Sequence, residues 1–574
     1  MKYLDSRKNL PMPSSFSAIR MLLVGLLTVA SSGVSAAELT VADLFTDHMV
    51  MQRRVAVPVW GWSNPGETVH VAITGQDKQA VEKQAVADAT GKWLVRLDPL
   101  EAGTPRTMTI TGSSTTLTIH DILLGEVWLC SGQSNMEWAL TKSKDADQAL
   151  ASADLPDIRL FNLVRGGANR AKGGPAERLP PSMQGTKPYA ETWQLCSPAS
   201  AKDNLSAVAF YFARDLFADL HVPIGLIINP VGGSAIQSWI SRTAFEADPD
   251  LKSVTAYFDR QAEFVTTPAG QTQLAERTAA YAVKAKAALA TGKPLWPSQY
   301  PVPVKDGFTS MWFNSRVNPL IPFAIKGVLW YQGEANTYAR DDTKGEYPAE
   351  YCGLLPLLIR DWRSRWGQGD FPFLYVQLPW WGSVINDPNA GGGGWCALRE
   401  IELKALSSIA NTGMAVTIDV GDSSIHPLNK QPVGARLTLA ARKVAYNEPI
   451  VASGPLYSGM QIDGTTIRIS FTSVGGGLVA RDGDLKQFSI AGADGRFVWA
   501  AARIDGATVV VSSPAVPAPT MVRYAWQTNP QGCNLFNQEG LPASPFRTDE
   551  PPLPPLGAYY QRKLQAPAGL APVN

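Results

Sequence analysis

The stretch ILLGEVWLCSGQSNM, residues 122–136, decides how the rest of the chain is interpreted. Apart from Glu126, its first nine residues are apolar or glycine, which is typical of a strand buried on both faces of a sheet. The apolar run ends at Ser131, where small and polar residues replace the large apolar ones. The pattern predicts a buried strand whose carboxyl end presents polar side chains.

The same transition recurs three times further along the chain. An apolar run at residues 224–228 ends in VGGS, one at 325–331 ends in QGEAN, and one at 414–420 ends in GDSSIHP. Apolar residues at helical spacing lie between these runs, at residues 205–220, 351–366, 395–406 and 433–444. Strands that alternate with helices predict an α/β fold, a parallel sheet with helices on both faces. In such a sheet ligands bind at the carboxyl ends of the strands, so we expect the four polar ends to form one cleft.

This alternation covers residues 121–448, which we expect to form the catalytic domain. Residues 37–120 and 449–549 show short β-type runs separated by Gly, Asn and Pro, and we expect a β-sandwich-like domain on each side of the core. Residues 245–310 are rich in Ala and Lys and predict a helical insertion. The Pro-rich residues 550–574 predict an extended tail on the surface.

The N-terminus has the pattern of an export signal. A basic stretch ends at Arg20, the apolar run MLLVGLLTVA follows at residues 21–30, and Val34 and Ala36 have the spacing that signal peptidases prefer. The apolar run is too short to span a bilayer. We therefore expect residues 1–36 to be a signal peptide and the mature protein to be periplasmic or extracellular.

Composition and charge exclude several classes of protein. Hydrophobic residues make up 45% of the 574 residues and charged residues 18%, which is typical of a folded protein. The formal net charge of +1 gives no electrostatic attraction to nucleic acid or to an anionic membrane, and we expect neither as a partner. The five cysteines form no CxxC pair, so we expect at most one or two disulfides, no metal and no cofactor.

Histidine is scarce, and this narrows the choice of a general base. His48, His70 and His120 lie in the N-terminal β region, and His221 lies at the end of a helix before a strand. Only His426 follows a strand of the predicted sheet and lies among polar residues. Elimination therefore favours His426 as the base of an active site.

Ser134 is the candidate nucleophile. A serine hydroxyl is a poor nucleophile until a base takes its proton, and Ser134 follows the first buried strand within the sequence GQSN. A serine at this place can also be an ordinary helix N-cap. The motif GxSxG is absent, which disfavours the nucleophile elbow of α/β-hydrolases. The sequence predicts a serine hydrolase in which His426 activates Ser134.

A tetrahedral intermediate on Ser134 needs hydrogen-bond donors for its oxyanion. The strand ends provide the backbone N–H of Ser134, the backbone of Gly232 or Gly233, and the side-chain amides of Gln332 or Asn336. We expect the oxyanion hole to be drawn from these groups.

Three motifs at these strand ends belong together. They are GEVW at residues 125–128 running into SGQSNM, WYQGE at residues 330–334 with Asn336, and IHP at residues 425–427 with Lys430. Together they resemble the sialate O-acetylesterase family of SGNH hydrolases. The likeness extends to VPVWG at residues 57–61 and to GLPA at residues 540–543, and so covers nearly all of the chain after the expected signal.

The resemblance implies a flavodoxin-like SGNH core, no metal, and removal of acetyl groups from sugar hydroxyls through an acetyl-serine intermediate. It assigns Ser134 as nucleophile, His426 as base, and Gly232, Gly233 and Asn336 as oxyanion donors. It does not determine the sugar, since some relatives act on sialic acids and others on acetylated plant cell-wall glycans such as xylan or xyloglucan.

The sequence departs from the family at the third member of the triad. The family has an Asp close before the His, as in Asp-Ile-His-Pro, whereas this chain has Ser424 there and Ser423 before it. Asp422 is the nearest carboxylate and our first choice for the triad acid. The alternatives are a Ser–His dyad held by a backbone carbonyl, or a carboxylate from elsewhere, such as Glu334.

Aromatic residues suggest where a sugar binds. Three tryptophans flank a glycine-rich run at residues 389–394, which can move as a lid, and exposed indole rings can stack on sugar faces. A tryptophan is more often part of a core, and the Arg399–Glu400 pair, which resembles a family feature, can equally be a solvated salt bridge. We expect the substrate-binding residues to be Trp380, Trp381, Trp395, Glu334 and Arg399.

The sequence thus predicts an exported carbohydrate O-acetylesterase. Two alternatives stay open: a lipase or thioesterase of the same superfamily, and a non-catalytic carbohydrate-binding protein on a hydrolase scaffold.

Overall fold

The structure is a computed structural model that describes residues 38–75, 80–163, 192–290, 309–339, 342, 344–549 and 551–567. The expected signal peptide, residues 1–36, lies outside the described residues. In the part of the chain that is described, no helix has the length and apolar character needed to cross a membrane. All five cysteines are free thiols.

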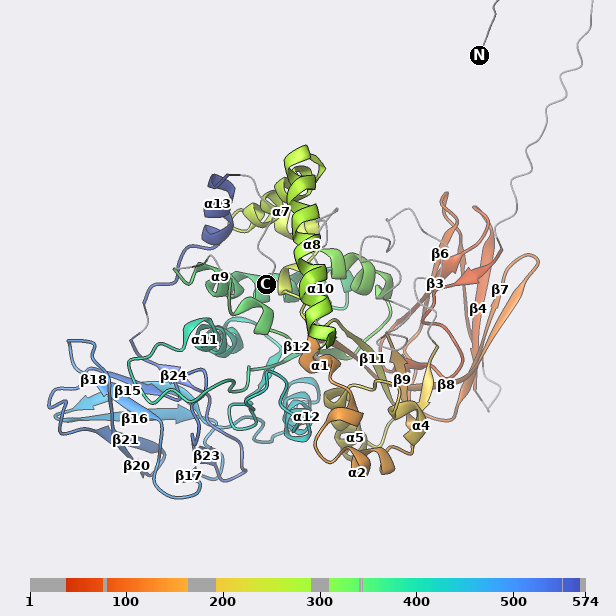
Figure 1. The fold of residues 1–574 in the computed structure, drawn as a ribbon. Helices are drawn as coiled ribbons and strands as arrows, with labels where there is room; N and C mark the ends of the chain where they lie inside the picture. Colours follow the sequence, from red (N-terminus) through yellow and green to blue (C-terminus); the bar gives the residue numbers. More distant parts are fainter. Residues whose placement is uncertain are drawn as a thin grey trace, which may run out of the picture. The chain divides into compact units, whose positions relative to one another are not determined.

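A mixed sheet of eleven strands organises the protein, and its main path runs β10-β9-β11-β8-β12-β13-β14 (Figure 1). These strands are β8 (Thr116–Gly132), β9 (Leu155–Asn162), β10 (Gln194–Cys196), β11 (Ile224–Pro230), β12 (Gly327–Tyr331), β13 (Phe373–Val376) and β14 (Thr412–Ala415). Neighbours from β9 to β14 are parallel, as the sequence predicts, and β10 joins one edge antiparallel.

The central strand β8 ends where its two neighbours end. Gly132 lies opposite Pro230 of β11 and Tyr331 of β12. Gly132 has a φ of +132°, and a Cβ there would lie 2.2 Å from the carbonyl oxygen of Tyr331, so only glycine fits. The chain leaves β8 toward β9 and β11 and then crosses to β12, which makes this edge the topological switch point where α/β proteins bind ligands.

Helices cover both faces of this sheet. Side chains alternate along a strand, and Trp128 of β8 is in register with Gly327 of β12, so Trp330, three residues further on, points to the opposite face. Trp128 packs edge-to-face on Phe212 at 5.1 Å, and Trp330 packs on Trp362 at 5.8 Å. The helices on the two faces are therefore α5 (Ala207–Leu220) and α10 (Tyr351–Trp366). Figure 1 shows α12 (Gln431–Ala445) beside α5 on the first face.

The N-terminal strands are continuous with the central sheet. They are β1 (Thr40–Val41), β2 (Val50–Gln52), β3 (Val57–Trp62), β4 (Thr68–Thr74), β5 (Ala80–Val86), β6 (Lys92–Leu97) and β7 (Arg106–Thr111). The first part of β8 pairs antiparallel with β7, and its last part lies between β11 and β12. The boundary expected between residues 120 and 121 therefore falls inside a strand, and one hydrophobic core joins the N-terminal strands to the α/β part.

Helices occupy the region of the expected insertion and the end of the chain. The helices here are α6 (Arg242–Ala247), which begins three residues before the expected start of the insertion, α7 (Lys252–Thr266) and α8 (Pro268–Ala290). Within the expected extended tail, α13 (Ala558–Gln565) packs on α7 instead, with Tyr559 and Tyr560 buried. The carboxylate of Glu350 accepts the backbone N–H groups of Gly557 and Tyr559, at 2.7 and 3.1 Å, and so anchors the start of α13. Burial of two aromatic rings explains why this segment folds back as a helix.

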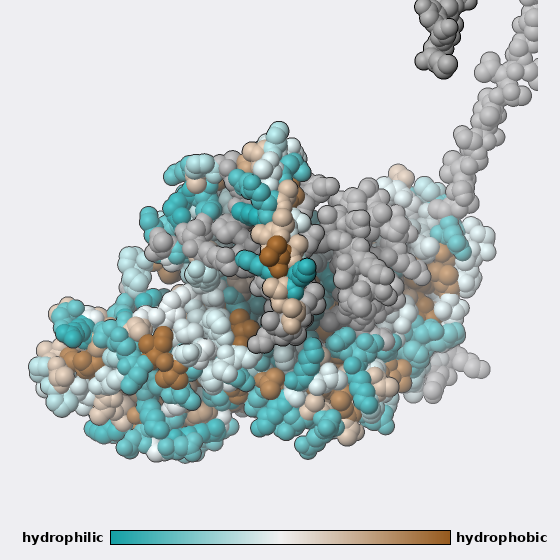
Figure 2. Space-filling model, viewed as in Figure 1, coloured by the Kyte–Doolittle hydropathy of each residue, from teal (hydrophilic) through white to brown (hydrophobic). Residues whose placement is uncertain are grey.

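The C-terminal strands have a hydrophobic core of their own. Two four-stranded sheets run β15-β16-β21-β20 and β19-β18-β22-β24, and β17 pairs with β23. The strands are β15 (Leu456–Asp463), β16 (Thr466–Thr472), β17 (Leu478–Ala480), β18 (Phe488–Ala491), β19 (Val498–Trp499), β20 (Ala501–Asp505), β21 (Thr508–Ser512), β22 (Met521–Tyr524), β23 (Leu535–Asn537) and β24 (Phe546–Arg547). On the face shown in Figure 2 their hydrophobic residues are scattered among hydrophilic ones, as is usual for a protein surface.

Polar contacts join this region to the α/β part. Arg547 of β24 forms a buried ion pair of 2.8 Å with Glu400, on α11 (Gly393–Ser408). The Gln377 side chain, just after β13, donates to Ser544 Oγ at 2.9 Å. The remaining short helices are α1 (Ser134–Glu137), α2 (Ala146–Ala151), α4 (Pro198–Ala201) and α9 (Glu346–Ala349).

Candidate active site

Ser134 and His426 meet at the carboxyl edge of the sheet. Ser134 is the first residue of α1, directly after β8, and is half-buried. His426 lies in the loop between β14 and α12, and its Nε2 is 2.8 Å from Ser134 Oγ. This is the distance expected of a nucleophile and the base that takes its proton.

Neighbouring side chains hold the loop of His426 against the nucleophile. The Trp138 indole stacks on the imidazole, with ring centroids 4.9 Å apart and planes inclined by 21°. Asn135, the residue after the nucleophile, donates from Nδ2 to the Ile425 carbonyl at 3.0 Å. The imidazole of His426 therefore packs on Trp138, and the carbonyl of the preceding residue, Ile425, accepts a hydrogen bond from Asn135.

The surroundings of His426 keep its imidazole neutral. Burial, together with the positive charges of Lys430 and Lys142, lowers the pKa of His426 to about 4. A neutral imidazole is the form that can accept a proton from Ser134.

Asp422, the expected triad acid, caps its own turn. Its Oδ1 accepts from Ser423 Oγ at 3.0 Å and from the Ser424 backbone N–H at 3.2 Å. The pairing of Asp422 with His426 stays a prediction.

Glu334 belongs to a buried cluster behind the nucleophile. Its Oε1 accepts from Asn135 Nδ2, and Asn135 Oδ1 accepts from Lys430 Nζ. Burial raises the pKa of Glu334 and lowers that of Lys430 to about 7. Glu334 is 7% exposed, so the structure places it beneath the site and not on a surface that a sugar can contact.

Gly232, one of the expected oxyanion donors, lies against the nucleophile. A Cβ on Gly232 would lie 3.5 Å from Ser134 Cβ. Its backbone N–H donates to Glu137 Oε2 at 2.6 Å. Gly233 follows with a φ of +72°, a conformation that favours glycine in this turn.

The amides of Gln332 and Asn336 are buried in a network under these glycines. Gln332 Nε2 donates to Gln133 Oε1, to the Ser234 carbonyl and to Asn336 Oδ1, at 3.2, 3.1 and 2.8 Å. These protein acceptors engage the amide of Gln332, which differs from its expected role as an oxyanion donor. Asn336 Nδ2 donates to Gln237 Oε1 at 3.0 Å.

Of the three tryptophans expected to bind sugar, Trp381 is the exposed one. Trp381 is 36% exposed to solvent, and its ring packs on the ring of Trp395, with the two centroids 5.0 Å apart. Trp395 is buried and donates from Nε1 to the Pro379 carbonyl at 2.8 Å, and so supports Trp381 without reaching the surface. Trp380 is half-buried. An isolated β-bridge between Trp381 and Asp422 places the backbone of Trp381 beside the loop of His426.

Arg399 is not a substrate-binding residue in the structure. Its side chain is fully buried, at 0% exposure, and its guanidinium donates to backbone carbonyls on two segments. The acceptors are Leu378 at 2.9 Å, Pro379 at 2.6 Å, Gln527 at 2.8 Å and Thr528 at 3.0 Å. Arg399 therefore fastens the C-terminal region to the segment that leads to Trp381.

The sequence pattern left four residues of this site without a role. They are Asn135, Glu137, Trp138 and Lys430, which surround Ser134 and His426. The available signal for Glu137 and Trp138 was their spacing, because residues three and four positions after Ser134 share its side of a helical turn. Lys430 is part of a motif that resembles the family, but its contact with Asn135 joins distant parts of the chain and is not encoded locally.

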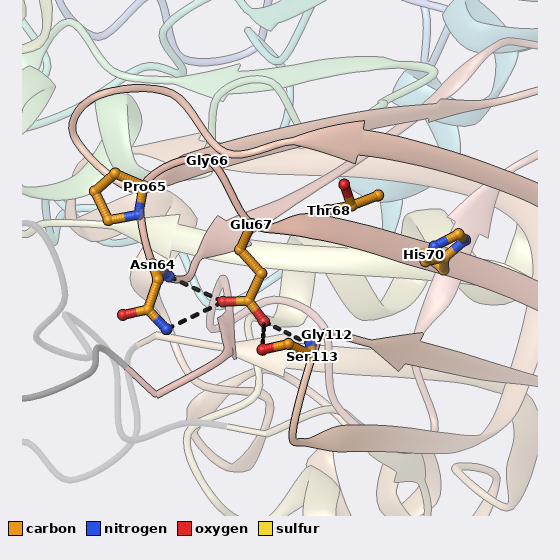
Figure 3. Close-up of a pocket in the computed structure, with 8 residues that line it drawn as sticks. All are labelled: Asn64, Pro65, Gly66, Glu67, Thr68, His70, Gly112 and Ser113. Carbon is orange, nitrogen blue, oxygen red and sulfur yellow. Dashed lines mark hydrogen bonds between the residues drawn. The ribbon is translucent and has the colours of Figure 1, made fainter.

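A separate pocket of about 520 Å³ lies between two turns of the N-terminal strands, at Asn64–Thr68 and Gly112–Ser113 (Figure 3). The Glu67 carboxylate accepts from the backbone and side chain of Ser113, at 2.7 and 2.8 Å, and from those of Asn64, at 3.1 and 3.2 Å. These hydrogen bonds, those from Ser113 first, lower the pKa of Glu67. The carboxylate thus ties the two turns together, and its acceptor positions are used in doing so.

Comparison with known proteins gives a consistent result. No family profile matches the chain. The crystal structure of a carbohydrate acetylesterase from Xanthomonas citri is similar, with a TM-score of 0.70 and 34% identity, over 89% of this chain and 99% of that one. Sialate O-acetylesterases from Mus musculus and Homo sapiens are 29% and 28% identical over 88% of this chain, covering 93% and 91% of their own lengths.

An α/β fold with these relatives defines a carboxylic ester hydrolase with O-acetylesterase activity. The chain matches them over nearly the whole of their length, flanking strands included. It belongs to the sialate O-acetylesterase family.

Proposed function

We propose that the protein is an exported carbohydrate O-acetylesterase with an SGNH-type core, in which Ser134 carries the acetyl group as a covalent intermediate. The observation that carries this proposal is the 2.8 Å contact between Ser134 Oγ and His426 Nε2 beside the Gly232 N–H. We further propose residues 1–36 as the signal peptide, 121–448 as the catalytic domain, and 37–120 and 449–549 as flanking β domains, with strand β8 shared across the boundary at residue 120.

The proposed reaction has two halves. Ser134 Oγ attacks the acetyl carbonyl carbon while His426 Nε2 takes the hydroxyl proton. The backbone N–H groups of Ser134 and Gly232, with the Asn336 amide, stabilise the oxyanion. The intermediate then expels the sugar oxygen, which takes the proton from His426 and leaves acetyl-Ser134. Water activated by His426 attacks this ester, and acetate leaves as Ser134 regains its proton.

The orientation of the imidazole in this proposal comes from the residues around it. The stacked Trp138 ring and the bond from Asn135 to the Ile425 backbone keep Nε2 directed at Ser134. Asp422 as the triad acid and a Ser–His dyad both stay open as proposals.

The pH dependence tests this arrangement. Because the pKa of His426 is lowered to about 4 from an ordinary 6.5, its neutral form persists in acid, and we expect the acid limb of kcat/KM near pH 4. In the unfolded chain the imidazole binds a proton near pH 6.5, whereas in the folded protein it does so only near pH 4. The free energy of unfolding contributed by this group is therefore lost as the pH falls from about 6.5 to about 4. A pH profile of kcat/KM, with unfolding followed in parallel, measures both effects. An acid limb at or above pH 6.5 would show instead that a carboxylate pairs with the imidazole.

The substrate is proposed to be an acetylated glycan, either a plant cell-wall polysaccharide such as xyloglucan or xylan, or sialic acid. The exposed ring of Trp381, whose backbone lies beside the loop of His426, supports a sugar over an acyl chain, because aromatic faces stack on sugar rings. A lipase or thioesterase needs a long apolar acyl pocket next to the nucleophile instead.

Acetate release from acetylated xyloglucan, acetylated xylan and O-acetylated sialic acid, measured side by side, tests the function. We expect rapid release from one of these classes and slow turnover of a long-chain acyl ester used as the control. Faster turnover of the long-chain ester would favour the lipase alternative. Binding of a glycan without release of acetate would favour the non-catalytic alternative.

A further inference from the structure

Three strand ends meet at the side chain of Asn135, the residue after the nucleophile. Asn135 lies on α1, after β8. Glu334 begins the short helical turn that follows β12, and Lys430 lies between β14 and α12, directly before that helix begins. All three side chains are buried. One amide therefore connects the GQSN, YQGE and IHP segments, which are far apart in the sequence.

The amide of Asn135 has different partners on its two sides. Its Oδ1 accepts from Lys430 Nζ, and its Nδ2 donates to Glu334 Oε1 and to the Ile425 carbonyl, the latter at 3.0 Å. Ile425 precedes His426, whose Nε2 lies 2.8 Å from the hydroxyl oxygen of the nucleophile. Both hydrogens of Nδ2 are thus in use, and one of them is bonded to the loop that carries the base.

The charges of Lys430 and Glu334 decide which way this amide points. An ammonium group has only donors, and a carboxylate has only acceptors. If the amide were turned over, its N–H groups would face the ammonium and its oxygen would face the carboxylate, and the Ile425 carbonyl would lose its donor. The bond to the loop of His426 therefore depends on both charges.

Stability does not explain why this pair of charges lies in the interior. The desolvation of two buried charges commonly exceeds their mutual attraction, so an apolar pair of similar volume is often as stable or more stable. Burial raises the pKa of Glu334 and lowers that of Lys430, and the opposite charge of each partner counters this effect on the other. A role in orienting the amide accounts for a pair that stability alone does not favour.

We propose that Lys430 and Glu334 are positioning residues, whose opposite charges orient the Asn135 amide so that it holds the loop of His426 against the nucleophile. This inference rests on the proposed function, because that function assigns the role of base to His426. It also gives a physical reason why the three motifs occur together: the side chain after the nucleophile is oriented by one group from each of the other two.

Lys430→Met is expected to lower kcat for 4-nitrophenyl acetate about ten- to hundredfold, because a base displaced by about 1 Å accepts the proton of Ser134 poorly. We expect KM to change by less than about twofold, because Lys430 is buried and its loss removes no contact with the substrate. Steady-state kinetics of the wild type and the variant give both ratios.

A double variant separates positioning from stability. Lys430→Met alone leaves the Glu334 carboxylate buried without the opposite charge, which destabilises the protein. Combining it with Glu334→Gln removes both charges, and we expect a higher thermal midpoint than for the single variant. We expect kcat to stay at the low value of the single variant, because a glutamine amide has both a donor and an acceptor and does not impose one orientation on Asn135.

The acid limb of kcat/KM gives a second readout. The positive charge of Lys430 contributes to the lowered pKa of His426, so we expect the limb to move upward by about half a pH unit in both variants. Lys142, the other cation that lowers this pKa, is unchanged. Burial raises the pKa values of Tyr331 and Glu402, which also interact with the pair, well above their usual range, so both groups are neutral near pH 4. The shift therefore reports the loss of the Lys430 charge.

Lys326→Met is the matched control. Lys326 also lies over a tyrosine ring, with Nζ 4.9 Å from the centroid of Tyr446, as Lys430 Nζ lies 5.4 Å from that of Tyr331. It directly precedes β12, at the end of this strand away from Glu334. We expect this variant to keep the kcat and the acid limb of the wild type.

Three results would overturn the proposal. One is a double variant that regains the wild-type kcat together with its stability, since the pair would then only support the fold. The others are an acid limb that stays near pH 4 in both variants and a kcat for Lys430→Met equal to that of Lys326→Met. Equal hydrolysis of 4-nitrophenyl acetate by the wild type and Ser134→Ala would instead refute the proposed function, a result obtained before any Lys430 variant is compared.

Discussion

Ser134→Ala is expected to lower kcat for acetate release by about 10⁴- to 10⁶-fold, leaving only the contribution of binding and the oxyanion donors. The reason is the geometry of one pair of atoms. Ser134 Oγ is the hydroxyl that His426 Nε2 reaches, at 2.8 Å, and an alanine leaves the neutral imidazole with no nucleophile to activate. Acetate release from the preferred glycan measures the loss, and thermal unfolding of the variant shows whether the fold is kept.

Ser131→Ala is the matched control for this experiment. Ser131 lies in the same motif but is fully buried and donates to the Asn229 carbonyl at 3.2 Å, away from the chemistry. We expect this variant to release acetate at close to the wild-type rate. Rapid quenching of the wild type followed by peptide mass spectrometry should also detect an acetyl group on the peptide that contains Ser134. Equal rates for wild type and Ser134→Ala would exclude Ser134 as the nucleophile.

Arg399→Met is expected to destabilise the protein by about 3 kcal/mol or more. The methionine keeps much of the volume but removes every donor, which leaves the buried carbonyls of Leu378 and Gln527 without a partner. The carbonyls of Pro379 and Thr528 keep one donor each, the Trp395 Nε1 and the Trp381 backbone N–H. Burial lowers the pKa of Arg399, so removing its charge recovers part of its desolvation cost, and this limits the net loss. The orphaned carbonyls outweigh this gain because each costs about 1–3 kcal/mol.

Differential scanning calorimetry of Arg399→Met measures the loss, and activity on the glycan should fall with it, because the same carbonyls fix the segment before Trp381. Arg360→Met is the control, since Arg360 is largely exposed and its ion pair with Asp248 is long, at 3.8 Å, and therefore weak. A thermal midpoint for Arg399→Met equal to that of Arg360→Met would contradict the structural role assigned to Arg399.

The parts of the fold and site that could be predicted are those encoded by local pattern. The apolar runs and their polar ends identified the strands of the central sheet, and the position of Ser134 and His426 after two of these strands brought the pair together. Parallel strands end at one edge, so strand position alone constrains where such residues lie.

The rest depends on contacts that the local sequence does not contain. Arg399 has the composition of a surface residue, and only its bonds to carbonyls about 130 positions away make it part of the interior. Asp422 is close to His426 in sequence, and the bonds from Ser423 and Ser424 to its carboxylate depend on the turn that the loop forms. Gln332 was expected to face the reacting atoms, but its amide donates to acceptors on two other segments, at Gln133 and Ser234, and to Asn336 of its own segment.

Strand β8 belongs both to the N-terminal strands and to the parallel part of the sheet, and this limits how such proteins can change during evolution. Residues 116–122 of this strand pair with β7, and residues 126–132 lie between the strands that lead to the active site. A gene rearrangement that exchanged the N-terminal strands as a module would have to cut this strand, leaving an unpaired strand end in the sheet that carries the nucleophile. The N-terminal strands and Ser134 are therefore inherited together, whereas the C-terminal strands, with a core of their own, can diverge at a different rate.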